Sequence, residues 1–138
     1  YDLYDNRCGV RQESRQFSWL NEAIVESLAI AYCERFEGPL PEEDRSYYKE
    51  RALYGWLCQY VDERYFVEAY LDGNNRPGET SNRRWDILSR RIKESFGPGF
   101  LQALDAVVNH PELGIDRATE IVIRGGRTKA LRRLAYLA

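Results

Sequence analysis

Residues 18–36 read SWLNEAIVESLAIAYCERF. Apolar side chains recur in this segment at spacings of three and four residues, which is the repeat of an α-helix. Ser18 can cap such a helix at its N-terminus, and Gly38 and Pro39 would stop it. We therefore expect a helix over residues 19–36.

The rest of the chain shows the same pattern, in which periodic apolar segments are separated by Gly and Pro clusters. No alternating pattern typical of a β-strand competes with it, and residues 1–17 show no clear period. The sequence predicts an all-α, single multi-helix domain over residues 1–138 with an irregular N-terminal segment. Further helices are expected at about 42–60, 64–71, 82–95, 100–109, 116–124 and 127–137.

Composition narrows the class of protein. The 138 residues include 20 Lys and Arg against 22 Asp and Glu, so the formal net charge is only -2. A chain with so little net positive charge has no strong field for a polyanion, which disfavours nucleic acid as a partner. The longest apolar run, from Leu28 to Cys33, is far shorter than a membrane-spanning helix, so we expect no membrane partner.

The beginning of the sequence is also informative. It contains no Met and opens with Tyr1, from which we expect a fragment of a longer protein.

The three cysteines of the chain are odd in number and have no Cys-x-x-Cys spacing. We expect free thiols in a reducing, cytoplasmic compartment.

A helical wheel of residues 19–36 places two carboxylates in an apolar stripe. Glu22 and Glu26 fall in line with Val25, Ala29 and Cys33, while the opposite side is also apolar. The wheel therefore predicts a helix covered on most sides. A buried carboxylate is costly unless a cation, a metal or a set of hydrogen bonds compensates it.

Two interpretations of this pair are open. Glu22 could be a metal ligand or a catalytic carboxylate, with Glu26 one turn later orienting a neighbouring ligand. Alternatively, Glu22 lies near the positive end of the helix dipole, and both carboxylates pair with arginines elsewhere.

The segment from Phe17 to Leu28 resembles the second active-site helix of gluzincin-type zinc metallopeptidases. In that family, an Asn-Glu-x-x-x-Asp/Glu pattern follows a His-Glu-x-x-His helix, and Asn21, Glu22 and Glu26 match this pattern. The stretches from Tyr47 to Leu53 and from Phe66 to Leu71 are similar to the helical region that follows the motif. The resemblance extends over roughly residues 17–108.

The resemblance implies a zinc site in the intact protein. Glu22 would be the third zinc ligand, and Asn21 and Glu26 would support the site, Glu26 through a hydrogen bond to a histidine ligand. The zinc would activate a water to hydrolyse a peptide bond in a peptide or protein substrate. This chain has no His-Glu-x-x-His, so it would supply one part of the site, bind no cofactor alone and be inactive alone.

Two other sets of residues are of types that occur in active sites. Tyr48 and Arg51, with Tyr47, could polarise a substrate carbonyl, although tyrosines at a helix start commonly pack with the hydroxyl at the rim. The single histidine, His110, precedes Pro111 and is typical of a helix end or a surface residue.

The C-terminal segment is rich in arginine on both sides of Gly125 and Gly126. This pattern loosely fits a helix-turn-helix, but it equally fits the solvent-facing edge of an amphipathic helix. The sequence thus favours the C-terminal helical part of a zinc metallopeptidase. The alternative is a non-catalytic helical module for protein interaction, and a nucleic-acid-binding domain is the weakest of the three.

Overall fold

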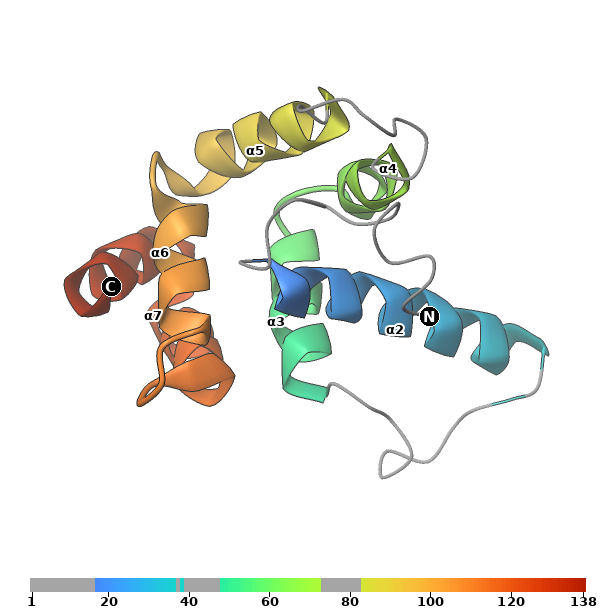
Figure 1. Cartoon of the computed structure of the whole chain (residues 1–138), viewed down its shortest axis with the longest axis horizontal. Coiled ribbons are helices and arrows are strands. Elements are labelled where there is room, and N and C mark those ends of the chain that lie inside the picture. The colour runs from blue at the N-terminus through green and yellow to red at the C-terminus, as the bar shows by residue number, and fades with distance from the viewer. Residues whose placement is uncertain (1–16, 37, 39–47, 73–82) are drawn as a thin grey trace.

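The computed structural model describes residues 17–36, 38, 48–72 and 83–138. Within these ranges the chain forms six α-helices and no strand (Figure 1), which confirms the all-α prediction. The helices are α2 (Ser18–Phe36), α3 (Tyr48–Cys58), α4 (Glu63–Asp72), α5 (Arg83–Phe96), α6 (Phe100–Val108) and α7 (Gly114–Leu137).

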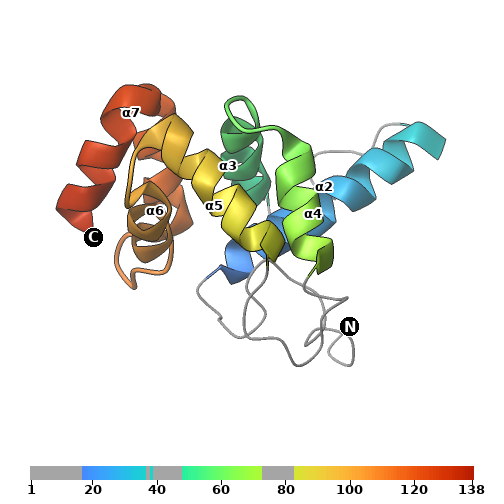
Figure 2. The ribbon, with the colours of Figure 1, turned by 90° about the horizontal axis from the view of Figure 1, so that it is seen from above.

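Helix α3 lies in the middle of the fold (Figures 1 and 2). It packs against α2 on one side and against α7 on the other, while α2 also contacts α4. Helix α5 bridges these two sides because it packs on α4 and leads directly into α6, which forms the most extensive interface of the fold with α7. The buried residues of the described helices form one core.

Aromatic side chains fill the core where α3, α5 and α6 meet. The rings of Phe96 and Phe100 stack with centroids 4.4 Å apart, and Trp56 lies 5.4 Å from Phe96. The turn between α5 and α6 brings these two phenylalanines together, and its Gly97 and Gly99 have φ angles of 98° and 83°. Such angles favour glycine, which explains the Gly-Pro-Gly sequence at this turn.

The expected helix bounds agree well with the structure. For α2, α4, α5 and α6 each end lies within one residue of its expected position. Helix α3 ends at Cys58 rather than at Tyr60, and the start expected near Glu42 lies outside the described residues. The turn expected over residues 72–78 also lies almost wholly outside them.

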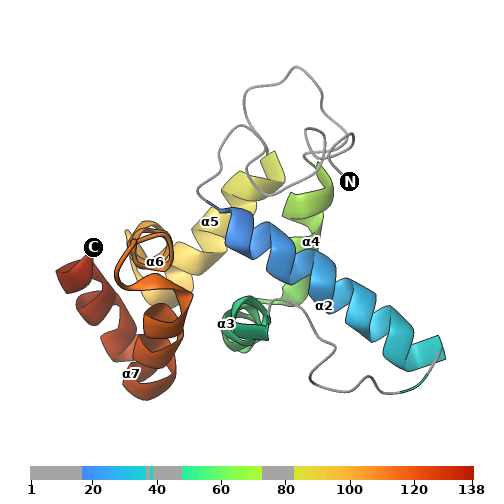
Figure 3. The same ribbon diagram turned by 60° about the horizontal axis from the view of Figure 1, so that its bottom comes forward.

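The expected covering of α2 on most sides is wrong. Its core residues are confined to the first half of the helix, where Trp19, Leu20, Ala23 and Ile24 are buried. The second half projects beyond the other helices (Figure 3), and the side chains of Tyr32 and Phe36 are each 64% exposed. A wheel reports which faces are apolar, but it does not show where neighbouring helices stop.

Helix α7 changes direction at one residue. Gly126 has φ 67° and ψ 178°, which interrupts the helical geometry. This agrees with the expected break between two helical segments, and the break is a kink without an intervening loop. Ala118, Ile121 and Val122 anchor the first half in the core, and Ala130 and Leu134 anchor the second.

Among the described helices, none is both long enough and apolar enough to cross a membrane.

Candidate functional site

The carboxylates singled out in the sequence lie at the edge of the core of α2. Glu22 and Glu26 are both half-buried, whereas the core face of the helix is formed by residues such as Leu20 and Ile24. The stripe that they share with Val25 is therefore a border between core and solvent, and Ala29 in the same stripe is exposed.

Glu22 lies near a small group of charges where α2, α3 and α7 meet. Burial raises the pKa of Glu50 above its ordinary value, and the negative charges of Asp116 and Glu22 raise it further. A backbone hydrogen bond of Glu50 and the positive charge of Arg51 act in the opposite direction. The structure thus brings Glu22 and Arg51 to the same carboxyl group, and Glu26 is not among the groups that act on it.

Tyr48 and Arg51 stand at the start of α3. The guanidinium carbon of Arg51 lies 5.8 Å from the centre of the Tyr48 ring, a distance compatible with a cation–π contact. Tyr48 is 51% exposed, which agrees with a tyrosine packed at the rim of the fold.

The described residues contain no metal centre. Nowhere in the part of the chain that the structure describes do three or more His, Cys, Asp or Glu side chains gather closely enough to hold a metal ion. His110 is exposed, and its Nδ1 accepts a hydrogen bond from the backbone N–H of Glu112 at 3.0 Å.

The thiol of Cys58 is in a state that disfavours nucleophilic chemistry. Burial is the main reason that its pKa rises to about 12, so it is protonated at neutral pH. The neighbouring Tyr54 hydroxyl donates to Glu63 Oε2 at 3.1 Å, and burial also raises the pKa of this phenol. A thiolate is the nucleophilic form of cysteine, so the raised pKa disfavours Cys58 as a nucleophile.

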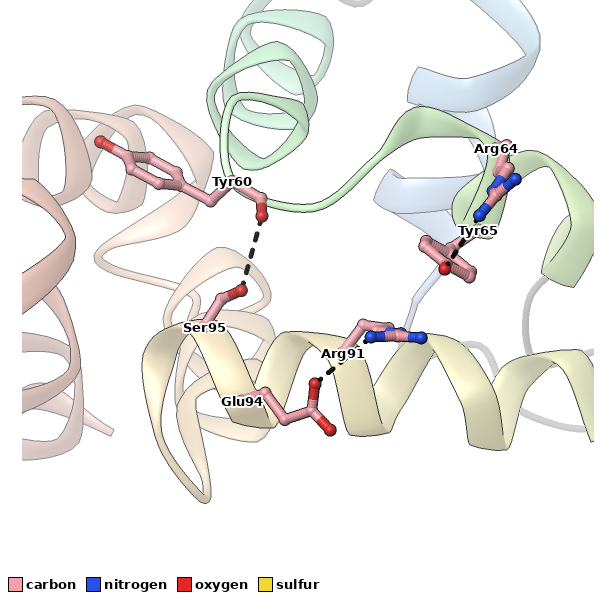
Figure 4. Close-up of polar contacts among 6 residues, drawn as sticks. All are labelled: Tyr60, Arg64, Tyr65, Arg91, Glu94 and Ser95. Atoms are coloured by element: carbon pink, nitrogen blue, oxygen red, sulfur yellow. Dashed lines mark hydrogen bonds and ion pairs between the residues drawn. The ribbon is translucent and has the colours of Figure 1, made fainter.

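A cluster of aromatic and basic side chains joins α4 to α5 (Figure 4). The guanidinium carbons of Arg64 and Arg91 lie 5.0 Å and 5.1 Å from the centre of the Tyr65 ring. Arg91 also pairs with Glu94 at 3.6 Å, and Arg64 donates a hydrogen bond to the Tyr65 hydroxyl at 3.2 Å. Nearby, Ser95 donates to the Tyr60 carbonyl oxygen at 3.5 Å. These contacts hold helices together at an exposed surface.

A buried carboxylate on α6 was missed by sequence reasoning. Asp105 is 6% exposed, and its Oδ1 accepts hydrogen bonds from Trp19 Nε1 at 2.8 Å and Asn109 Nδ2 at 3.0 Å. Burial raises the pKa of Asp105 to about 6, and these two hydrogen bonds oppose the rise. The signal was present, because Asp105 interrupts the apolar face of the segment Phe100–Val108.

Three of the C-terminal arginines line one pocket. Arg117 comes from the first half of α7 and Arg132 and Arg133 from the second, so the pocket lies in the angle formed at Gly126. Its volume is about 360 Å³. The remaining lining residues are Ile121, Tyr136 and Leu137.

The arginines of this pocket differ in their partners. Arg117 pairs with Glu120 at 3.3 Å, and Arg124, outside the pocket, pairs with the same carboxylate oxygen at 3.2 Å. Arg132 and Arg133 are exposed and make no ion pair within the described ranges. Their guanidinium groups are therefore available to an anion that enters the pocket.

A second basic pocket lies between α5 and α6. It has a volume of about 390 Å³ and includes Arg90, Lys93 and the turn from Gly97 to Gly99. Unlike the pocket at the kink of α7, it presents a single arginine.

Comparison with known proteins gives a weak and consistent result. The chain is 26% identical over 141 residues to a protein of Burkholderia mallei that is named chorismate synthase. It is 23% and 22% identical over 137 residues to proteins of the same name from Cupriavidus metallidurans and Cupriavidus necator. Each alignment covers 91% of this chain and 36% of the relative, so the chain spans about a third of the length of these proteins. No family model and no solved structure matches it.

The comparison corrects the functional prediction. The similar proteins are named chorismate synthase, so the resemblance to gluzincin-type peptidases is wrong, as is the inferred role in peptide hydrolysis by zinc-activated water. A six-residue pattern on one helix is short enough to arise by chance, and the described residues lack a metal-binding group. The alternative of an interaction module gains no support from the comparison.

The roles given to single residues are a separate matter. No finding tests Glu22, Asn21, Glu26, Tyr48 or Arg51 individually, although the reaction for which they were selected is no longer supported. The expected localisation, substrates and partners also stay predictions.

Proposed function

We propose that this chain is a helical part of a protein related to chorismate synthase and that it binds a small cyclic dicarboxylate, of which chorismate is an example, in the arginine-lined pocket of α7. The main observation behind this proposal is that Arg117, Arg132 and Arg133 line one pocket of about 360 Å³. The names of the similar proteins supply the second support.

The chemistry of the pocket suits a carboxylate ligand. A guanidinium group binds a carboxylate with two parallel hydrogen bonds, and two such groups can hold the two ends of a dicarboxylate. Ile121 and Leu137 offer an apolar wall for a carbon ring, with the ring of Tyr136 beside them. The volume also falls within the usual range for small-molecule sites.

The binding of chorismate to the chain tests the proposal directly. Isothermal titration would compare chorismate with its uncharged dimethyl ester, and we expect binding of the diacid alone. An R132Q/R133Q double variant should weaken binding by about tenfold or more, because it removes charge-assisted hydrogen bonds.

The control is Arg124→Gln, which removes an exposed charge from the same helix but outside the pocket. It should leave binding unchanged. Equal affinity of the double variant and the wild type would contradict the proposal. Loss of binding in Arg90→Ala would instead assign the ligand to the pocket between α5 and α6.

A further inference from the structure

The pocket next to Asp105 has the opposite electrostatic character to the pocket of α7. It has a volume of about 390 Å³ and is lined by Phe17, Gln102, Asp105, Ala106 and Asn109. Asp105 is the only one of these residues that carries a charge. Its carboxyl group is largely buried, whereas Gln102 and Ala106 at the rim are exposed.

The carboxyl group of Asp105 is held firmly through one oxygen. Both Trp19 Nε1 and Asn109 Nδ2 donate to Oδ1. Asn109 Nδ2 also donates to the main-chain oxygen of Asp105 at 3.0 Å, which fixes the amide relative to the carboxyl group. The orientation of the carboxyl group is therefore set by α2 and by the C-terminal end of α6.

The other oxygen is free to receive a donor. None of the hydrogen bonds among the described residues ends at Oδ2 of Asp105. A carboxylate can accept several hydrogen bonds, so a group held in this way at the wall of a pocket retains acceptor capacity. Among the described residues, no basic side chain lines the pocket to neutralise it.

We propose that the Asp105 pocket binds the primary ammonium group of a small aliphatic amine, with Oδ2 of Asp105 accepting its hydrogen bond. The rim amide of Gln102 can accept a second N–H group, and Ala106 and Phe17 can contact the aliphatic carbons. A divalent metal ion is a poor fit, because it needs several oxygen ligands and the described residues of the pocket offer one carboxylate. This site is independent of the dicarboxylate pocket of α7.

Butylammonium is the probe for the proposed site, with 1-butanol as a neutral ligand of the same shape and tetramethylammonium as a cation without N–H groups. Binding would be followed by NMR through the indole N–H resonance of Trp19, which is assigned with the Trp19→Phe variant. We expect butylammonium to shift this resonance saturably and the two other compounds to leave it unchanged. Equal effects of butanol and butylammonium would overturn the proposal.

Asp105→Asn is the decisive variant because it keeps an acceptor for Trp19 and removes the charge. It should weaken butylammonium binding by roughly tenfold to a hundredfold, the range for losing a hydrogen bond to a charged group. The matched control is Glu112→Gln, which removes an exposed carboxylate outside the pocket and should bind as the wild type does. Unchanged affinity in Asp105→Asn would refute the site.

If Asp105→Asn fails to fold, butylammonium binding can instead be measured over a range of pH with Asp105 in place. Binding should weaken as the pH falls through about 6, because the carboxylate then takes up a proton. Burial, Trp19 and Asn109 set the pKa of Asp105, and no charged group of α2, α5 or α7 contributes to it. The series is run in a His110→Gln background, which removes the single histidine of the chain. Binding that is constant from pH 7.5 to 5 would contradict the proposal.

Discussion

The indole Nε1 of Trp19 donates a hydrogen bond to Oδ1 of Asp105 at 2.8 Å across 86 positions of sequence. Trp19 is in the first turn of α2 and Asp105 is on α6, so this one bond connects the two sides of the fold. Both side chains are almost fully buried. A hydrogen bond to a charged group in such a place is stronger than one between neutral groups.

Trp19→Phe should therefore cost more stability than an ordinary aromatic truncation. We expect a loss of about 2–4 kcal/mol in the free energy of unfolding, because the change removes a charge-assisted hydrogen bond as well as buried volume. Urea denaturation at pH 7.5 measures it. The matched control is Trp56→Phe, since the indole of Trp56 packs on Phe96 and has no hydrogen bond among the described residues. Equal losses in both variants would mean that the bond contributes nothing beyond volume.

The raised pKa of Asp105 makes a signed prediction about stability and pH. In the folded protein the pKa of Asp105 is about 6, whereas the ordinary pKa of an aspartate side chain is 3.8. Because the folded state binds more protons in this interval, the contribution of Asp105 is greatest at pH 4 and declines as the pH rises to 6. The contribution of Asp105 to the free energy of unfolding should fall by roughly 1–2 kcal/mol over this interval. This is less than the pKa shift alone would give, because water in the pocket screens the charge.

Asp105→Asn isolates this effect from the titration of other carboxyl groups. The variant should be about as stable as the wild type near pH 4 and more stable by roughly 1–2 kcal/mol at pH 7.5, because asparagine carries no charge to bury. Urea denaturation at both pH values measures the difference. Glu112→Gln should show no such change between the two pH values. A constant difference between Asp105→Asn and wild type would contradict the assigned titration.

The stability of Asp105→Asn and the binding of an amine would together explain why position 105 carries a carboxylate. If asparagine is the more stable residue at neutral pH, the carboxylate is retained against stability. Binding of an amine in the pocket would then offset the cost of the buried charge, since a ligand that binds only the folded state stabilises it.

The helices could be predicted from the sequence because their signals are local. Apolar spacing together with the Gly97-Pro98-Gly99 turn is sufficient to place α5 and α6 within one residue. The same local reasoning failed for the second half of α2, where the apolar residues Tyr32 and Phe36 are exposed. Which faces are covered depends on where other helices end, and this information is not contained in the helix itself.

The candidate sites could not be predicted for a related reason. Asp105 gains its environment from Trp19, which is distant in sequence, and an isolated aspartate in an apolar stretch gives no indication of its partner. The arginine pocket depends on the angle at Gly126, which brings Arg117 close to Arg132. The sequence predicted the break in this segment but not the direction in which the second half continues.

The protonated state of Cys58 gives a chemical prediction. Because burial raises the pKa of its thiol to about 12, very little thiolate is present at pH 8. Alkylation of Cys58 by iodoacetamide should be about a hundredfold or more slower than that of an unstructured cysteine peptide, since the rate follows the thiolate fraction. Mass spectrometry of tryptic peptides over time gives the rate. A rate close to that of the peptide would contradict the assigned environment, and labelling in 6 M urea should restore it.

The kink of α7 can be tested at two adjacent glycines. Gly126 has φ 67° and ψ 178°, a region that side chains with a Cβ rarely adopt, so Gly126→Ala should cost about 1–3 kcal/mol in the free energy of unfolding. A Cβ on the preceding Gly125 would meet its nearest neighbour, Lys129 Cβ, at 3.6 Å, which is ordinary contact. Gly125→Ala should therefore be neutral or stabilising by up to about 1 kcal/mol, because alanine has the higher helix propensity.

The same pair of variants connects the kink to the arginine pocket. Arg117 and Arg132 come close only because the two halves of α7 meet at an angle, so straightening the helix would separate them. Gly126→Ala should thus weaken chorismate binding at a temperature at which the variant is still folded, as judged by circular dichroism, and Gly125→Ala should not. Retention of full affinity in a folded Gly126→Ala variant would show that the pocket does not need the kink.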